Sequence, residues 1–191
     1  MSERRPGVYL ALVHHPVRDR SGATITTSVT NLDVHDIARS ARTYGVSGYY
    51  VVTPIEAQRA LVKHILGYWR EGGGGTRVPE RADALSIVRD IDSIGDALAD
   101  IERIEGARPR VYTTAARSDH HSVAYDVAAA ELRARTGPAL LVFGTGHGLA
   151  DSVIALADVH LAPVRPHGYN HLAVRAAVSI ILDRLFGDAG A

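Results

Sequence analysis

The sequence contains no cysteine. This absence excludes disulfide bonds, thiolate nucleophiles and cysteine-based zinc sites. The sequence also has no run of eighteen apolar residues, so it predicts no membrane-spanning helix. The first residues, MSERRPGVYLALVHHP, lack the length and the small-residue cleavage site of a signal peptide. From these absences we expect a soluble, cytoplasmic protein.

Lysine is nearly absent as well, since Lys63 is the only one. Lysine and arginine together number 21, aspartate and glutamate also number 21, and the formal net charge is zero. A protein that binds nucleic acid by nonspecific attraction to phosphate is usually basic. Arginine suits bidentate recognition of phosphate, although GC-rich coding also accounts for its excess here. Any binding to nucleic acid should therefore be local and dependent on shape.

The order of apolar and polar segments predicts an α/β fold with a mostly parallel sheet and helices on both faces. A length of 191 residues suits one domain, and 46% hydrophobic residues permit a real core. Strands are expected at 8–13, 48–53, 84–88, 109–115, 140–143 and 159–164. Helices are expected at 33–44, 55–71, 93–105, 118–135 and 170–186. The four consecutive glycines at 72–75 predict a flexible loop.

The segment 140–172 carries two glycine-bearing turns beside apolar runs. The first apolar run ends in Gly144-Thr145-Gly146-His147-Gly148, and the second leads to Gly168-Tyr169-Asn170. Glycine lets the backbone approach a ligand closely, and ligands of α/β sheets sit at the carboxyl ends of strands. Leu149 stands where a dinucleotide-binding motif has its third glycine, and no Lys-Ser/Thr pair follows as in a P-loop. The spacing alone fits both a ligand loop and an ordinary strand-to-helix turn.

Taken together, these turns resemble the C-terminal half of SPOUT-superfamily methyltransferases, which include the bacterial tRNA guanine-N(1) and the ribose 2'-O methyltransferases. The resemblance implies a C-terminal trefoil knot and one domain over residues 1–191, with a cofactor half at roughly 108–191. It implies S-adenosylmethionine as the cofactor, bound between three loops. The residues implied to bind the cofactor are Thr113, Thr114, Phe143, Gly144, Thr145, Gly146, Gly148, Leu161, Pro163, Gly168, Tyr169, Asn170 and Leu172.

A second chemical cluster lies in the helix that we expect to begin near Asp33. In the ribose-methylating branch of the superfamily, an asparagine precedes a helix that carries an arginine, and Asn31 and Arg39 resemble this pair. The resemblance implies that Arg39 contacts the target nucleotide and helps its hydroxyl to lose a proton. Asn31 would position that group or a phosphate. The usual intervening glycine is absent, so the methylated atom stays open between base and ribose.

The proton acceptor also stays open. Asp33, His35 and Asp36 could each act as the general base, and His14 and His15 end a strand from which they could reach the site. The plain alternative for this segment is a capped, solvated helix. The chain has ten histidines, but they show no metal-ligand spacing, so we predict no metal.

The last expected helix, 170–186, is apolar on most of its surface, with a polar stripe of Arg175, Ser179 and Asp183. A helix of this kind is buried on more than one side, either deep in the monomer or against a partner. SPOUT members dimerise through this helix, so the resemblance implies a homodimer. The function predicted from the resemblance is S-adenosylmethionine-dependent methylation of tRNA or rRNA. The alternatives are a module that binds the cofactor or RNA without catalysis, and a nicotinamide oxidoreductase, which the broken third glycine opposes.

Overall fold

A parallel six-stranded sheet forms the centre of the computed structural model, which describes residues 6–115, 122–164, 169 and 171–187. The strand order is β5-β4-β1-β7-β6-β8. The strands are β1 (Val8–Val13), β4 (Gly48–Val52), β5 (Val88–Ile91), β6 (Arg110–Thr113), β7 (Ala139–Gly144) and β8 (Val159–His160). Every pairing in this sheet is parallel, which confirms the predicted mostly parallel sheet.

β1 is the buried middle of the sheet, because all six of its residues are apolar and buried. Its register places Leu10 opposite Tyr49 of β4 on one side and Leu141 of β7 on the other. Since side chains alternate along a strand, β1 contributes to a core on each face of the sheet. Leu10 and Leu12 belong to one core, and Tyr9, Ala11 and Val13 to the other.

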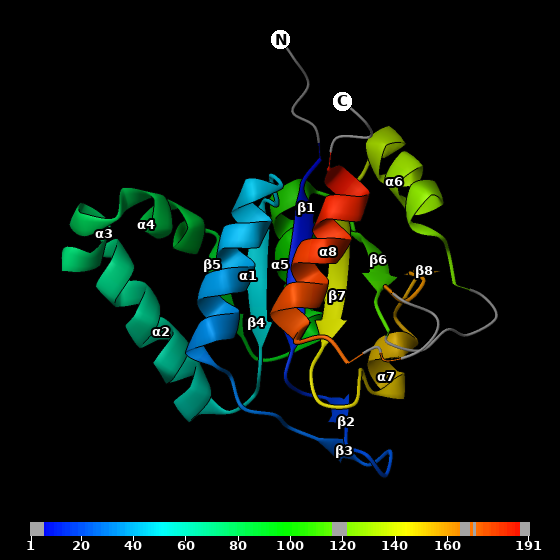
Figure 1. The fold of residues 1–191 in the computed structure, drawn as a ribbon, viewed down its shortest axis with the longest axis horizontal. Coiled ribbons are helices and arrows are strands. Elements are labelled where there is room, and N and C mark those ends of the chain that lie inside the picture. The colour runs from blue at the N-terminus through cyan, green and yellow to red at the C-terminus, as the bar shows by residue number, and fades with distance from the viewer. Residues whose placement is uncertain (1–5, 116–121, 165–168, 170, 188–191) are drawn as a thin grey trace.

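Helices cover both faces, as predicted. One face packs against α1 (Asn31–Thr43), α2 (Glu56–Arg70), α4 (Pro79–Ser86), α6 (Tyr125–Ala134) and α8 (Val174–Phe186). The opposite face packs against α5 (Ile94–Glu105) and α7 (Asp151–Ile154). In Figure 1, α1 and α8 lie side by side in front of the sheet, and α5 lies behind it.

α1 begins at Asn31, two residues before the predicted start at Asp33. Thr30, not Asp33, is the N-cap: its backbone is extended and its hydroxyl oxygen accepts the Asp33 N–H at 3.1 Å. The Thr30 hydroxyl in turn donates to the Asp33 carboxylate at 2.6 Å. Threonine and aspartate are both good N-caps, and an acidic side chain three residues after a threonine fits the capping-box pattern. Asn31 therefore lies in the first helical turn.

The apolar residues of α2 that are spaced by four, Ala57, Leu61, Ile65 and Trp69, do not form one buried stripe. Ala57 and Leu61 are exposed, and the buried residues are Val62 and Leu66. Ile65 and Trp69 are half-buried against the core. The spacing by four drifts around a helix that has 3.6 residues per turn, so the later members of the stripe turn inward and the earlier ones do not.

The four-glycine run is not a flexible loop. Gly73–Arg77 forms a short helix, α3, and Gly74 is buried. A Cβ atom on Gly74 would lie 2.8 Å from Cε3 of Trp69, so this position needs a residue without a side chain. The glycines therefore let the backbone of α3 pack closely against the last turn of α2.

Other boundaries also differ from the predictions. The strand predicted at 159–164 is only the two residues of β8, and the helix predicted at 170–186 begins at Val174. The predicted strand 84–88 begins inside α4, which runs to Ser86, and the strand β5 starts at Val88. Residues 118–121 of the predicted helix 118–135 lie outside the described part of the chain, and α6 begins at Tyr125. The segment 17–28 contains the small antiparallel pair β2 (Val17–Arg18) and β3 (Thr24–Ile25).

The polar stripe of α8 contacts α1. Ser179 shares a hydrogen bond with Ser40 at 2.7 Å, and Asp183 accepts from the Tyr44 hydroxyl at 2.9 Å. Arg175 pairs with Asp36 at 3.5 Å. Partners recur every four residues on both helices, so the two helices run parallel. This ladder fixes Arg175 of α8 beside the middle of α1.

Within the part of the chain that the structure describes, no helix is long and apolar enough to cross a membrane. Residues 165–168 and 170 lie outside that part, so the trefoil knot stays a prediction.

Candidate functional site

A cavity of about 500 Å³ lies at the carboxyl ends of β6 and β7. The glycine turn after β7, the segment after β6 and the first turns of α8 form most of its wall. We call it the cofactor cavity, and its lining residues are Ser28, Asp33, Thr114, Ala115, Phe143, Gly144, Thr145, Gly146, Gly148, Val164, His171, Leu172, Ala173, Val174, Arg175, Ala177 and Ile181. This is where the topology of a parallel sheet places ligands.

Backbone geometry explains the glycines of the turn. Gly146 has a φ of +60° and Gly148 a φ of +111°, a region that side chains disfavour. A Cβ on Gly146 would lie 3.0 Å from the Arg18 carbonyl oxygen. A Cβ on Gly144 would lie 2.9 Å from the Leu149 nitrogen. The turn is therefore folded tightly upon itself, and its bare backbone forms part of the cavity wall.

Hydroxyl groups tie this turn to the end of β1. The Thr145 hydroxyl donates to the Val13 carbonyl oxygen at 3.1 Å and contacts the Thr27 hydroxyl. Thr27 also lies 3.1 Å from Nδ1 of His14, a fully buried ring. His15, in contrast, bonds through Nδ1 to the Thr26 hydroxyl at 2.9 Å. His14 is thus a buried support beneath the turn.

Burial lowers the pKa of His14 to about 4, and the nearby Asp33 charge opposes this effect only in part. His14 is therefore neutral at pH 7.

Seven of the predicted cofactor residues line the cofactor cavity: Thr114, Phe143, Gly144, Thr145, Gly146, Gly148 and Leu172. Others lie elsewhere. Thr113 is buried and its hydroxyl lies 2.8 Å from Nδ1 of His160. Leu161 is buried where it pairs with Val123, and Pro163 is buried nearby. The Tyr169 side chain is 82% exposed, which directs it to solvent.

Gly168 and Asn170, which the resemblance also implied, lie outside the described residues. The described part of the third predicted cofactor loop therefore consists of Tyr169 and the segment from His171 onward.

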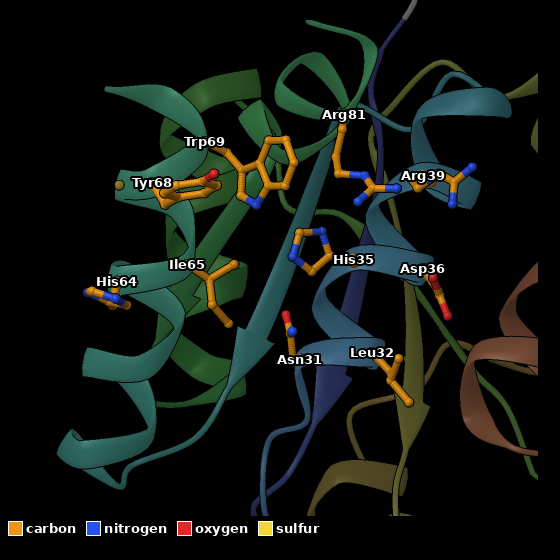
Figure 2. A pocket seen from close by; sticks show the side chains of 11 residues that line it. Asn31, Leu32, His35, Asp36, Arg39, His64, Ile65, Tyr68, Trp69 and Arg81 are labelled. Carbon is orange, nitrogen blue, oxygen red and sulfur yellow. The ribbon is translucent and has the colours of Figure 1, made fainter. Parts of the chain in front are cut away.

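The four predicted catalytic residues, Asn31, His35, Asp36 and Arg39, share a different cavity. It has a volume of about 740 Å³ and lies between α1 and α2 (Figure 2). Asp36 and Arg39 also line a shallow depression between α1 and α8, and Arg175 lines both this depression and the cofactor cavity. The structure thus brings the four residues together, but beside the cofactor cavity and not inside it.

Asp33 is the α1 side chain that lines the cofactor cavity, and it is only 6% exposed. The helix explains this difference, because residues two apart, such as Asn31 and Asp33, project about 200° from each other. The sequence named Asp33 as one of several possible bases, but its spacing could not show which face of α1 meets the cavity. Ser28 and Arg175 also line this cavity, and no sequence motif pointed to them.

Among the described residues, no group of three or more His, Cys, Asp or Glu side chains is placed to hold a metal ion.

Comparisons with known proteins agree with this architecture. The family model described as "SAM-dependent RNA methyltransferase" matches residues 7–187. The chain belongs to this family of S-adenosylmethionine-dependent RNA methyltransferases. The family and the fold confirm the resemblance that the two glycine turns indicated.

Three relatives illustrate the range of similarity. A tRNA (guanine-N(1)-)-methyltransferase from Nitratidesulfovibrio vulgaris is 47% identical over 191 residues, which cover 98% of this chain and 44% of that protein. An uncharacterized protein from Aquifex aeolicus is 41% identical over 94% of this chain and 88% of its own length. The SpoU methyltransferase AviRb from Streptomyces viridochromogenes is 18% identical, with a TM-score of 0.59 over 96% of this chain and 60% of that chain. At that identity the structural match shows the fold alone.

The cofactor cavity fits S-adenosylmethionine, the cofactor of the family. Its volume lies within the roughly 300–1,000 Å³ that is typical of small-molecule sites. Phe143, Leu172 and Ile181 supply apolar surface of the kind that an adenine ring contacts. The turn at Gly144 and Gly146 offers backbone polar groups without side chains in the way.

We predict that His14 makes the stability of the protein depend on pH. The pKa of folded His14, near 4, lies below the ordinary histidine value of 6.5, so the unfolded chain takes up a proton first as the pH falls. The free energy of unfolding should therefore decrease by about 3 kcal/mol between pH 6.5 and pH 4, and the contribution should be complete above pH 6.5. Urea unfolding of the wild type and of His14→Asn across this range measures the effect.

His14→Asn should lose this part of the pH dependence, whatever it costs at neutral pH. His35, whose pKa burial also lowers, stays in both proteins and contributes equally to each. An unchanged pH dependence in His14→Asn would contradict the assignment.

Proposed function

We propose that this chain transfers a methyl group from S-adenosylmethionine to a base nitrogen of tRNA, with Asp33 as the proton acceptor. The observation that carries this proposal is the Asp33 carboxylate, which lines the same cavity as the glycine turn and is 6% exposed. Family membership supports the reaction class. The tRNA guanine-N(1) activity in the name of the Nitratidesulfovibrio relative supports the substrate.

The chemistry requires a proton acceptor in the cavity. Bound S-adenosylmethionine supplies an electrophilic methyl group. A neutral guanine carries a proton on N1 and becomes a good nucleophile there only when that proton leaves. A carboxylate within hydrogen-bond reach of N1 can take the proton. One Asp33 oxygen accepts from Thr30, and a carboxylate has further lone pairs to offer.

Asp33 also has a simpler structural role. It completes the cap of α1, since its N–H and its carboxylate both bond the Thr30 hydroxyl. Asparagine can keep both of these bonds but cannot accept a full proton, so the two roles are separable by substitution.

We assign the predicted residues Asn31, His35, Asp36 and Arg39 to the RNA side of the site. They lie on the face of α1 next to the cofactor cavity, and Asp36 and Arg39 reach the depression that Arg175 also lines. Within one domain over the matched residues, the cofactor half at roughly 108–191 would be completed by Asp33 and Ser28 from the first half. A tRNA substrate would place this activity in the cytoplasm.

We expect micromolar binding of S-adenosylmethionine and S-adenosylhomocysteine, measured by titration calorimetry, and its loss in Gly146→Ala. A side chain at residue 146 meets the Arg18 carbonyl at a φ of +60°, so the turn must shift. Gly106→Ala is the matched control, because Gly106 has a φ of +74° at the end of α5 and open space around it. Both substitutions should cost about 1–2 kcal/mol of stability through the backbone alone.

Only Gly146→Ala should weaken cofactor binding. An equal loss in Gly106→Ala would mean that general destabilisation, not the cavity wall, controls the affinity. No binding to the wild type would contradict the assignment of this cavity.

We predict that Asp33→Asn lowers the rate of methyl transfer to unfractionated tRNA by about 10²–10⁴-fold while cofactor affinity changes little. Transfer is followed with a radiolabelled methyl group, and the modified nucleoside is identified by mass spectrometry. Asp96→Asn is the matched control, because Asp96 makes the same pair of bonds to the N-cap Ser93 of α5 and lies outside the cofactor cavity, and it should transfer methyl groups at the wild-type rate.

Asp33→Asn with wild-type transfer rates would leave Asp33 as a cap only. Cofactor binding without transfer to any tRNA or rRNA in the wild type would favour the alternative of a non-catalytic binding module.

We also propose a homodimer through α8. The support is the apolar character of this helix together with Leu172 just before it, which is 44% exposed, and Ile180, which is half-buried in the isolated chain. Sedimentation equilibrium at tens of micromolar protein should give twice the mass of the chain. A monomer at that concentration would overturn the proposal.

A further inference from the structure

The cavity between α1 and α2 takes no part in the methyl-transfer step that we propose for the cofactor cavity. We call it the α1–α2 cavity. In Figure 2, residues of α1 lie on one side, Ile65, Tyr68 and Trp69 of α2 lie on the other, and Arg81 reaches in from α4. Its volume of about 740 Å³ is large enough for a nucleotide-sized ligand.

One wall of this cavity is aromatic and firmly supported. Tyr68 and Trp69 meet edge to face, with ring centroids 5.4 Å apart and an interplanar angle of 89°. The His35 ring, on the opposite helix, meets the Trp69 ring edge to face, with the two ring centroids 5.6 Å apart. Gly74 packs against the back of Trp69, where a Cβ would lie 2.8 Å away. Tyr68 nevertheless keeps half of its surface exposed, so part of this residue is accessible to a ligand.

The cavity also holds two arginines without a carboxylate partner in the described part of the chain. Among the described residues, Arg39 and Arg81 form no ion pair with a carboxylate, whereas Arg42 and Arg110 do. The guanidinium of Arg81 instead lies 5.3 Å from the Trp69 ring centroid. In a chain whose formal net charge is zero, this is a local concentration of arginine.

Two buried polar nitrogens in this cavity lack hydrogen-bond partners. Nε of Arg81 and Nδ1 of His35 are both buried without a hydrogen-bond partner in the described part of the chain. The carboxylate of Asp36 does not serve them, because it pairs with Arg175 at 3.5 Å. Figure 2 shows Asp36 turned away from the cavity centre toward α8. Unpaired buried polar groups are costly, and a bound ligand relieves this cost.

We propose that the α1–α2 cavity binds an unpaired nucleotide of the RNA substrate close to the nucleotide that is methylated. Its base would stack on the aromatic wall of Tyr68 and Trp69, and its phosphate would contact Arg39 and Arg81. Aromatic faces bind single-stranded bases of any sequence, and guanidinium groups match phosphate geometry. An acidic peptide would use the arginines but would leave the aromatic wall without a role. This inference rests on the proposed action on RNA.

Shared walls connect this cavity to the cofactor cavity. Asp36 and Arg39 line the α1–α2 cavity and the depression between α1 and α8. Arg175 lines that depression and the cofactor cavity. An unpaired RNA segment can therefore cross α1 with one nucleotide at each end of this path.

Trp69 gives a direct test, because it is the only tryptophan in the chain. Its fluorescence is recorded while a single-stranded RNA oligonucleotide, a duplex of the same sequence, or inorganic polyphosphate is added. Stacking of a base quenches an indole ring, so the single strand should quench Trp69 at saturation. The duplex has no unpaired base and polyphosphate has no base, so both should leave most of the Trp69 fluorescence unquenched.

Variants then separate stacking from charge. Tyr68→Ala should raise the dissociation constant for the single strand about tenfold. Arg81→Gln should reduce the slope of log Kd against log salt concentration by about one. Arg108→Gln, which makes the same change at an exposed residue outside the cavity, is the control and should bind as the wild type does. Urea unfolding shows whether each variant is folded. If Tyr68→Ala does not fold, Arg81→Gln alone tests the proposal.

The outcomes distinguish this inference from the proposed function. Absence of quenching by the single strand overturns the cavity assignment, as does quenching by polyphosphate or an equal effect of Arg108→Gln. If tRNA is still methylated in that case, the proposed function stands without the cavity. Quenching that responds to Tyr68 and Arg81, in a protein that methylates no RNA, supports the cavity and overturns the proposed function.

Discussion

The parallel pairing of β1 with β7 is the constraint on which the site depends. It joins residues more than 130 positions apart, with Val13 opposite Gly144 at the carboxyl ends of both strands. Just beyond this pair, the Thr145 hydroxyl bonds back to the Val13 carbonyl oxygen, and Thr27 links the turn to buried His14. The glycine turn is therefore held by the centre of the sheet, and a ligand bound against it meets backbone that is already ordered.

α1 connects the two halves of the proposed chemistry. The cap at Thr30 fixes where the helix begins, so it also fixes which side chains turn toward the cofactor cavity. Asp33 turns toward that cavity, and His35 and Arg39 turn toward α2. The ladder from α1 to α8 then places Arg175 between the cavities. A single helix thus separates a site for methyl transfer from a surface that is suited to RNA, and keeps them in contact.

A chain with zero net charge can bind RNA where positive charge is concentrated locally. Most arginines for which the structure gives a contact are engaged with carboxylates or carbonyl oxygens, as Arg42 is with Asp83. Exposed pairs of this kind contribute little stability, but they cancel charge over much of the surface. Arg39 and Arg81 are different, because they lie in one cavity beside aromatic rings. Recognition at such a site depends on shape and stacking more than on long-range attraction.

The sequence by itself determined the α/β class, the parallel sheet, most strand positions and the glycine turn, because apolar periodicity and glycine placement are local properties. It also indicated the family through the order of those turns. Only the tertiary structure decided that Thr30 caps α1, that Gly74 packs against Trp69, and that Asp33 faces the cofactor cavity. Moving the start of a helix by one residue leaves the composition of the segment almost unchanged, so composition does not locate that start. The face that each side chain presents depends on what packs around the helix, and those contacts come from distant parts of the chain.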